Sequence, residues 1–151
     1  QKMRQALGSV LSVSGISESL PNSRTFVSLA DEKDAFGMPR ASISSYIDEM
    51  AIRRITFMSA TCRNILKAAG ANEIFEEFSS YDIFSSSHVF GTCRMGLKSD
   101  ESVVNSFCQS FRWKNLYVVD ASVFPSSGGG ESPGLTIQAL ALRAADHILR
   151  S

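Results

Sequence analysis

Apolar and polar side chains alternate along two stretches in the first third of the chain. Residues 24–29 and 41–47 each place apolar and polar side chains at successive positions, which is typical of half-buried β-strands. The charged segment 31–34 lies between them and is followed by glycine and proline, so it indicates a connection. We therefore predict an antiparallel, hairpin-like pair. Residues 1–22 are small and polar with scattered apolar positions, and they predict a loop or a short strand.

From Asp48 onward the apolar period changes to that of an α-helix. Apolar residues recur every three or four positions as far as Ala69, and charged and polar side chains occupy the opposite face. Gly70 follows where helices often end in a left-handed residue. We predict a helix over 48–69. The aromatic residues after it are interpreted as core or domain-interface packing rather than a substrate cage; they are Phe75, Phe78, Tyr81 and Phe84.

The last third of the chain predicts a strand, a glycine-rich loop and a helix in that order. Residues 116–119 are apolar on both faces, as in a strand buried inside a layered α/β sheet. Ser132 is a natural N-cap and Pro133 suits the first helical position, so we predict a helix that begins at Pro133. Its free N–H groups would face the loop and the end of the strand. We expect an electron-rich group to bind there.

Composition and charge argue against several classes of function. The 151 residues suffice for one domain with its own core, and 15 basic residues balance 15 acidic ones without a basic run. Nucleic acids and anionic membranes are therefore poor partners, and no apolar run reaches the ~18–20 residues of a membrane span. The chain begins at Gln1, and a targeting segment could have preceded it. Cys62, Cys93 and Cys108 lack metal-binding spacing, so we expect free thiols, no metal site and a cytoplasmic location.

Several residues in the second half are candidates for chemistry. His88 lies in a polar, glycine-bounded loop, where either a structural or a catalytic role is open. Asp120 follows the predicted strand and would either bind a ligand or cap a loop. His147 lies in the last helical turn, where a favourable interaction with the helix dipole is expected. The glycines at 128, 130 and 134 resemble a dinucleotide loop only weakly, because Pro133 falls where the last glycine belongs. No G-x-S-x-G motif supports a hydrolase.

Four sequence blocks and one upstream stretch resemble a known enzyme family. The blocks are H-V-F-G-T-C-R-M-G, S-V-V-N, N-L-Y-V-V-D-A-S-V-F-P and S-P-G-L-T-I-Q-A-L-A-L-R-A-A-D-H-I-L, and the upstream stretch is R-T-F-V-S-L-A-D-E-K-D-A-F-G-M-P. Together they resemble the carboxy-terminal region of the glucose-methanol-choline (GMC) oxidoreductases. The resemblance covers most of the chain from about Asn22 onward.

This resemblance implies an α+β fold. Its antiparallel sheet would be covered by helices, including that over 48–69, and a carboxy-terminal strand, loop and helix would return to an FAD-binding α/β layer. The implied division is a substrate-binding region over 1–85, a catalytic-histidine loop and connection over 86–111, and a part that completes the flavin site over 112–151.

The resemblance also implies an activity and a set of site residues. The cofactor would be FAD, and the reaction would remove a hydride from an alcohol or sugar CH–OH group. His88 would act on the substrate hydroxyl as general base or hydrogen-bond partner, and the last helix would point its N-terminus at the flavin. The implied cofactor-binding residues are Asp120, Ala121, Pro133, Gly134, Leu135 and Thr136.

Two departures from the family pattern leave alternatives open. Ser132 stands at the second catalytic position, where the family usually has histidine or asparagine, and Glu131 precedes it. Either Ser132 only caps the helix and His88 works with another group, or Glu131 assists. The family's amino-terminal FAD fingerprint is also absent, so we expect the chain to work with an amino-terminal FAD-binding portion of the same enzyme. A non-catalytic substrate-recognition or interaction module is the alternative.

Overall fold

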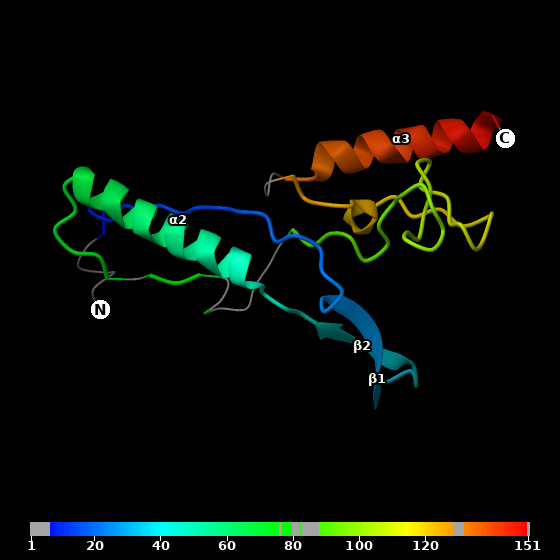
Figure 1. The fold of residues 1–151 in the computed structure, drawn as a ribbon, viewed down its shortest axis with the longest axis horizontal. Coiled ribbons are helices and arrows are strands. Elements are labelled where there is room, and N and C mark those ends of the chain that lie inside the picture. The colour runs from blue at the N-terminus through cyan, green and yellow to red at the C-terminus, as the bar shows by residue number, and fades with distance from the viewer. Residues whose placement is uncertain (1–6, 76, 80–81, 83–87, 129–131, 151) are drawn as a thin grey trace. The chain divides into compact units, whose positions relative to one another are not determined.

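The computed structural model of the chain describes residues 7–75, 77–79, 82, 88–128 and 132–150. Within them it has an α+β structure with a two-stranded sheet and two α-helices (Figure 1). The elements are β1 (Phe26–Lys33), β2 (Pro39–Ser44), α2 (Glu49–Ala68), the short 3-10 helix η1 (Ala121–Val123) and α3 (Gly134–Arg150). The chain forms two compact units, one made of Gln1–Ser17 and Asp48–Ser85 and the other of Glu18–Ile47 and Ser86–Ser151.

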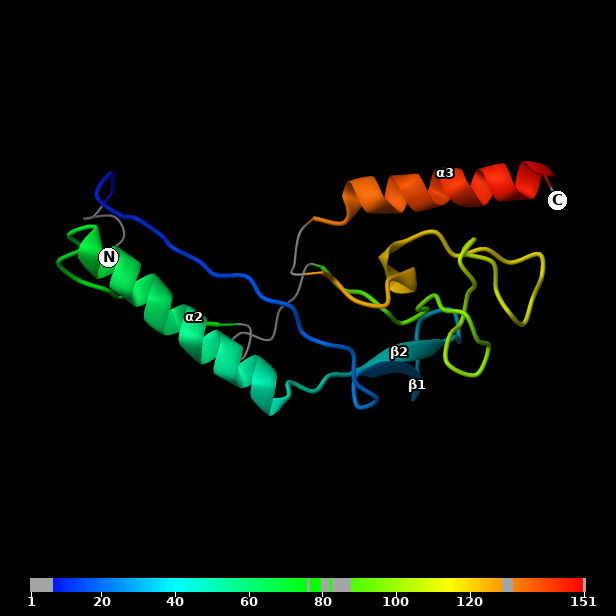
Figure 2. The ribbon, with the colours of Figure 1, turned by 45° about the horizontal axis from the view of Figure 1, so that its top comes forward.

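The predicted hairpin is confirmed. β1 and β2 pair antiparallel, with Val27 opposite Ile43, and lie side by side in both views (Figure 2). The Asp34 carboxylate accepts hydrogen bonds from the N–H groups of Phe36 (2.9 Å) and Met38 (3.0 Å), and so fixes the turn between the strands. The charged residues predicted as a connection instead extend β1 as far as Lys33.

The predicted covering of the sheet by a helix stays a prediction. All of β1 except Ala30 is exposed, and α2 belongs to the other compact unit. Because the charged residues at the end of β1 are exposed, they can continue the strand without a desolvation cost. The functional division into 1–85, 86–111 and 112–151 stays a prediction.

In the first unit, α2 closely matches the predicted helix. The Asp48 carboxylate accepts a hydrogen bond from Ala51 N–H at 2.7 Å, which makes Asp48 the N-cap. At the other end Gly70 has a φ of +86°, and the N–H groups of Gly70 and Ala71 bond back to the carbonyls of Lys67 and Leu66. This is the Schellman arrangement, which glycine permits because it has no Cβ.

Two contacts tie the rest of the first unit to α2. A Cβ added to Gly15 would lie 3.1 Å from Met58, so the segment before Ser17 passes close to the helix. Glu77 accepts hydrogen bonds from the Ser59 hydroxyl and from the Arg63 guanidinium, the latter at 2.5 Å. These two donors hold the pKa of Glu77 below its usual value, the Ser59 bond being the larger cause.

The core of the second unit lies between α3 and the irregular segment before it. Val104, Cys108, Val123 and Ala144 are buried there, and partly buried side chains such as Met95 and Leu140 pack around them. Backbone bonds from Cys93 to Ser122 (2.9 Å) and from Met95 to Val123 (2.8 Å) join the loop after His88 to η1. The core therefore holds in place the segments that carry the candidate site residues.

The predicted strand at 116–119 is wrong for the described chain. The segment makes one isolated bridge, between Tyr117 and Gln109, and Leu116 and Val119 are 44% and 37% exposed. A strand that is apolar on both faces needs a covering layer on each side, whereas within the described residues Tyr117 and Val118 pack against the core and Leu116 and Val119 stay exposed. The return of this segment to an FAD-binding layer is therefore only a proposal.

No helix in the described parts of the chain is both long and apolar enough to cross a membrane. The three cysteines are free in the structure.

Candidate functional site

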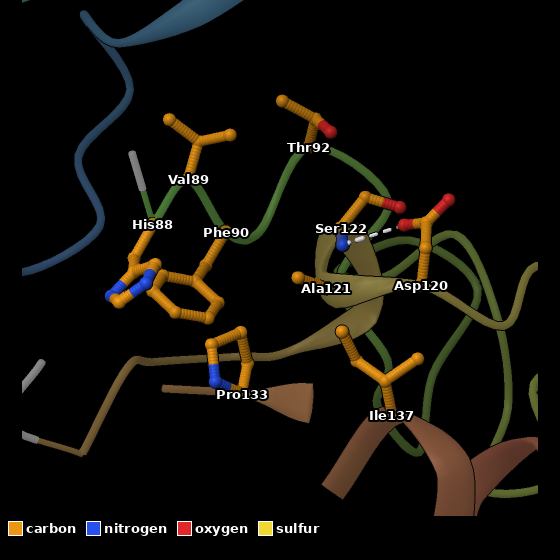
Figure 3. A pocket seen from close by; sticks show the side chains of 9 residues that line it. All are labelled: His88, Val89, Phe90, Thr92, Asp120, Ala121, Ser122, Pro133 and Ile137. Carbon is orange, nitrogen blue, oxygen red and sulfur yellow. Dashed lines mark hydrogen bonds between the residues drawn. The ribbon is translucent and has the colours of Figure 1, made fainter. Parts of the chain in front are cut away.

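A pocket of about 420 Å³ in the second unit brings together three segments that lie far apart in the sequence. The loop at 88–92, η1 with the residue before it, and the start of α3 form its walls (Figure 3). Four predicted site residues meet here, namely His88, Asp120, Ala121 and Pro133. The full lining is His88, Val89, Phe90, Thr92, Asp120, Ala121, Ser122, Pro133 and Ile137.

The loop that carries His88 is held against η1 by packing and by the backbone. The Phe90 ring stacks on Phe124, with 5.4 Å between ring centroids and 14° between the planes. Gly91 has a φ of +86°, where a residue with a Cβ would be strained, and it lies against the Phe124 carbonyl. His88 itself is exposed, and its ring extends on the same side as that of Phe90, toward Pro133 (Figure 3). The imidazole can therefore be reached from the pocket.

Asp120 has the loop-capping role that the sequence left open. Its Oδ1 accepts a hydrogen bond from Ser122 N–H at 2.7 Å, and its extended backbone makes it the N-cap of η1 (Figure 3). Because this bond uses one carboxylate oxygen, Oδ2 keeps its acceptor capacity. Capping fixes Asp120 and Ala121 at the pocket wall and is compatible with ligand contact.

The start of α3 differs from the prediction by one residue. The helix begins at Gly134, and the first intrahelical bond runs from Ile137 N–H to the Pro133 carbonyl at 2.9 Å. Pro133 therefore occupies the cap position predicted for Ser132. Ser132 is exposed, and among the described residues its hydroxyl has no hydrogen-bond partner.

The N–H groups of Gly134, Leu135 and Thr136 precede the first intrahelical donor. They are the free donors expected at a helix N-terminus, and the positive end of the helix dipole coincides with them. The Leu135 and Thr136 side chains are exposed and are not part of the pocket lining. Any contribution of these two residues to binding would thus come from the backbone. Glu131 lies outside the described residues.

Sequence reasoning missed five lining residues. Ile137 follows Pro133 by four positions, so helical spacing could have placed both on one face. Ser122 donates to Asp120, a contact that the capping interpretation implies. The other three, Val89, Phe90 and Thr92, flank His88 in the quoted motif but carried no separate signal.

The other histidine lies elsewhere in the second unit. His147 is in the last turn of α3, as predicted, and its ring stacks on Phe107 with 4.2 Å between centroids. It does not line the pocket. No cluster of His, Cys, Asp or Glu within the described residues could hold a metal ion.

The chemistry of the pocket fits the flavin of FAD. Its volume lies in the ~300–1,000 Å³ range of small-molecule sites. Apolar side chains that include Phe90, Pro133 and Ile137 form much of the wall, as contact with a planar ring requires, while the polar groups are few. The free N–H groups at the start of α3 complement an electron-rich ring edge.

Comparison with known proteins identifies the family of this chain. The family model described as GMC oxidoreductase, for the carboxy-terminal domain, matches residues 21–141. The chain belongs to the GMC oxidoreductase family. Among its curated relatives, paromamine 6'-oxidase of Streptomyces fradiae is 38% identical over 128 residues, which are 85% of this chain and 23% of the relative.

Two further GMC relatives are dehydrogenases. The 2-methyl-1,2-propanediol dehydrogenase of Mycolicibacterium austroafricanum is 35% identical over 95% of this chain and 26% of its own length. The fructose dehydrogenase large subunit of Gluconobacter japonicus is 33% identical over 85% of this chain and 23% of its own length. This GMC chain thus spans about a quarter of the curated relatives that it matches.

Proposed function

We propose that this chain is the carboxy-terminal part of an FAD-dependent oxidoreductase that transfers a hydride from an alcohol or sugar CH–OH group to flavin. The observation that carries the proposal is the meeting of His88, the Asp120–Ala121 pair and the start of α3 around one pocket. The names of the relatives, which are oxidases and dehydrogenases, support the reaction class. The specific substrate is not part of the proposal.

FAD, when bound, supplies the hydride acceptor. In this proposal His88 accepts the proton of the substrate hydroxyl, or donates and accepts hydrogen bonds there as the C–H bond breaks. Its exposed position at the pocket gives a substrate access to the imidazole. Two walls of the pocket hold the cofactor. Asp120 and Ala121 form one of them, and Pro133 with the backbone of Gly134, Leu135 and Thr136 forms the other.

The N-terminus of α3 contributes electrostatically. Its free N–H groups and the positive end of the helix dipole stabilise negative charge at the adjoining edge of a bound ring. Such donors are oriented before the reaction starts, so little reorganisation is required as charge develops. This role needs the helix to begin next to the pocket, where Pro133 and Ile137 form part of the lining.

The second catalytic position is the least conventional part of the proposed site. Ser132 is exposed and precedes Pro133. It does not cap α3, because the helix begins at Gly134 and Pro133 is the residue directly before it. We propose that His88 carries the proton transfer without a major contribution from Ser132. Assistance by Glu131 is the alternative.

The outer face of α3 supports an amino-terminal partner portion of the same enzyme. Leu135, Leu142 and Leu149 recur every seven residues and are 82%, 72% and 84% exposed. They lie opposite Ala144, which faces the core. Such a row of leucines is typical of a helix face that packs against other protein. We propose that the portion that binds the rest of FAD covers this face.

The decisive test is flavin reduction in the full-length protein. Wild-type protein should show a flavin absorbance spectrum, and His88→Ala should slow anaerobic reduction by an alcohol or sugar substrate roughly 10²–10⁴-fold. Flavin content should be unchanged, because the imidazole is proposed to face the substrate. The matched control is Val89→Ala, which alters an adjacent lining residue without removing a titratable group.

Two results would contradict the proposal. Reduction at the wild-type rate in His88→Ala would remove His88 from the mechanism. A full-length protein that neither binds flavin nor is reduced would favour the alternative, a non-catalytic recognition module, for which the unusual Ser132 is the supporting feature.

A further inference from the structure

One carboxylate in the second unit has no part in the proposed chemistry, yet it is bound by a segment that adjoins the pocket. Glu18 Oε1 accepts hydrogen bonds from the N–H groups of Ser127 at 2.9 Å and Gly128 at 3.1 Å. The hydroxyls of Ser126 and Ser127 also hydrogen-bond to this carboxylate. Glu18 precedes Ser127 by 109 residues, so the contact is a long-range tie.

The local geometry explains why an anion is bound there. Gly128 has a φ of +67°, and successive N–H groups around a left-handed residue can form a concave anion-binding surface. Hydrogen bonds to a charged acceptor are roughly twice as strong as those between neutral groups. The Gly128 N–H bond is the largest of the causes that hold the pKa of Glu18 below its usual value, so the carboxylate is ionised at neutral pH.

The bound turn lies in sequence between two walls of the pocket. Phe124, which stacks on Phe90, lies two residues before Ser126. On the other side, the four peptide steps from Gly128 to Ser132 span at most about 14 Å. Fixing Gly128 therefore limits the space that Ser132 and Pro133 can reach. A free turn would lose this restriction.

We propose that Glu18 is a positioning residue, which fixes the turn at 126–128 and thereby limits where Ser132 and Pro133 can lie beside the pocket. The consequence for cofactor binding rests on the proposed function, whereas the tie itself does not. Because the acceptor is an anion, replacing Glu18 by the neutral glutamine should weaken these hydrogen bonds and loosen the turn without altering any lining side chain.

Amide hydrogen exchange in the full-length protein tests the tie directly. We expect Glu18→Gln to accelerate exchange in the peptide that covers 125–134 by about tenfold, since hydrogen bonds to a charged acceptor are stronger than those to a neutral one. Glu18→Asp keeps the charge on a side chain one methylene shorter and should restore part of the protection. The matched control is Glu32→Gln, which removes the same charge from the exposed strand β1 and should leave this peptide unchanged.

FAD titration of the apo-protein, well below its melting temperature, is the second measurement. Glu18→Gln should raise the dissociation constant about tenfold, which corresponds to about 1.4 kcal/mol, and Glu18→Asp should raise it less. Wild-type exchange at 125–134 in Glu18→Gln would overturn the tie. A lower melting temperature with an unchanged FAD dissociation constant would overturn the positioning role. If wild-type protein binds no FAD, the proposed function fails, and the exchange measurement still decides whether Glu18 holds the turn.

Discussion

At the scale of single residues, the pocket depends on where a few side chains are held. Phe90 packs on Phe124, and Asp120 accepts a hydrogen bond from Ser122, so contacts within the chain hold two walls in place. His88 remains exposed between them. Walls held in place around one accessible imidazole are what a general base requires, because its catalytic contribution depends on position.

Ser132 gives the sharpest residue-scale prediction because it neither caps α3 nor bonds to another described side chain. Ser132→Ala should change the free energy of unfolding by no more than about 0.5 kcal/mol, as for an ordinary surface substitution. In the full-length enzyme the rate of flavin reduction should fall by at most about tenfold, or about 1.4 kcal/mol of barrier. A rate loss beyond about a hundredfold at unchanged stability would instead show that Ser132 is catalytic.

Cys108 should be the least reactive of the three thiols. It is 1% exposed, and burial raises its pKa, an effect that the charge of Arg143 opposes. A raised pKa lowers the thiolate fraction at pH 8, and the thiolate is the nucleophile. We expect iodoacetamide to modify Cys108 at least about tenfold more slowly in the native protein than in the urea-unfolded protein. Mass spectrometry measures both rates. Equal rates in the two states would contradict the burial.

At the scale of elements, local sequence signals were sufficient wherever the determining contacts are local. Asp48 and Gly70 marked both ends of α2, and both take part in the observed caps. The hairpin followed from alternation together with a turn that one aspartate stabilises. The grouping of His88 with Asp120 came from family resemblance, and no periodicity in this chain would have indicated it.

Local signals failed where an element depends on neighbours. Residues 116–119 have the apolar composition of a strand that is covered on both faces, but they form only an isolated bridge in the structure. Composition alone does not tell whether neighbouring elements will cover a segment. The start of α3 at Gly134 lies one residue after the predicted boundary, and the local signals of Ser132 and Pro133 do not account for the difference. The tie from Glu18 to Ser127 spans 109 residues and has no local signature.

The N-cap of α2 can be tested against Ser132 as a matched pair. Asp48→Ala should lower the free energy of unfolding by about 0.5–2 kcal/mol, because it removes the acceptor of the Ala51 N–H bond. Asp48→Ser should retain most of the stability, since serine is also a good N-cap. Urea denaturation of both variants beside Ser132→Ala provides the comparison. An Asp48→Ala midpoint no lower than that of Ser132→Ala would show that the cap contributes nothing measurable.

At the scale of the whole molecule, the chain has little core of its own for its length. Five apolar residues are buried among those described, whereas many large apolar side chains are exposed. A GMC chain that spans about a quarter of its relatives can bury more of this surface only against further protein. The leucine row on α3 is its most regular exposed feature, because the side chains repeat on one helix face.

The effect of a leucine substitution on stability can show whether this face of α3 is covered in the full-length protein or exposed to solvent. If the amino-terminal portion packs on α3, Leu142→Ala in the full-length protein should lower the free energy of unfolding by about 2–4 kcal/mol, as for a buried leucine. The control is Leu97→Ala, at a loop leucine that is 93% exposed, which should cost no more than about 0.5 kcal/mol. Urea unfolding measures both variants. Equal, small effects would show that Leu142 faces solvent in the complete enzyme and that its partner portion packs elsewhere.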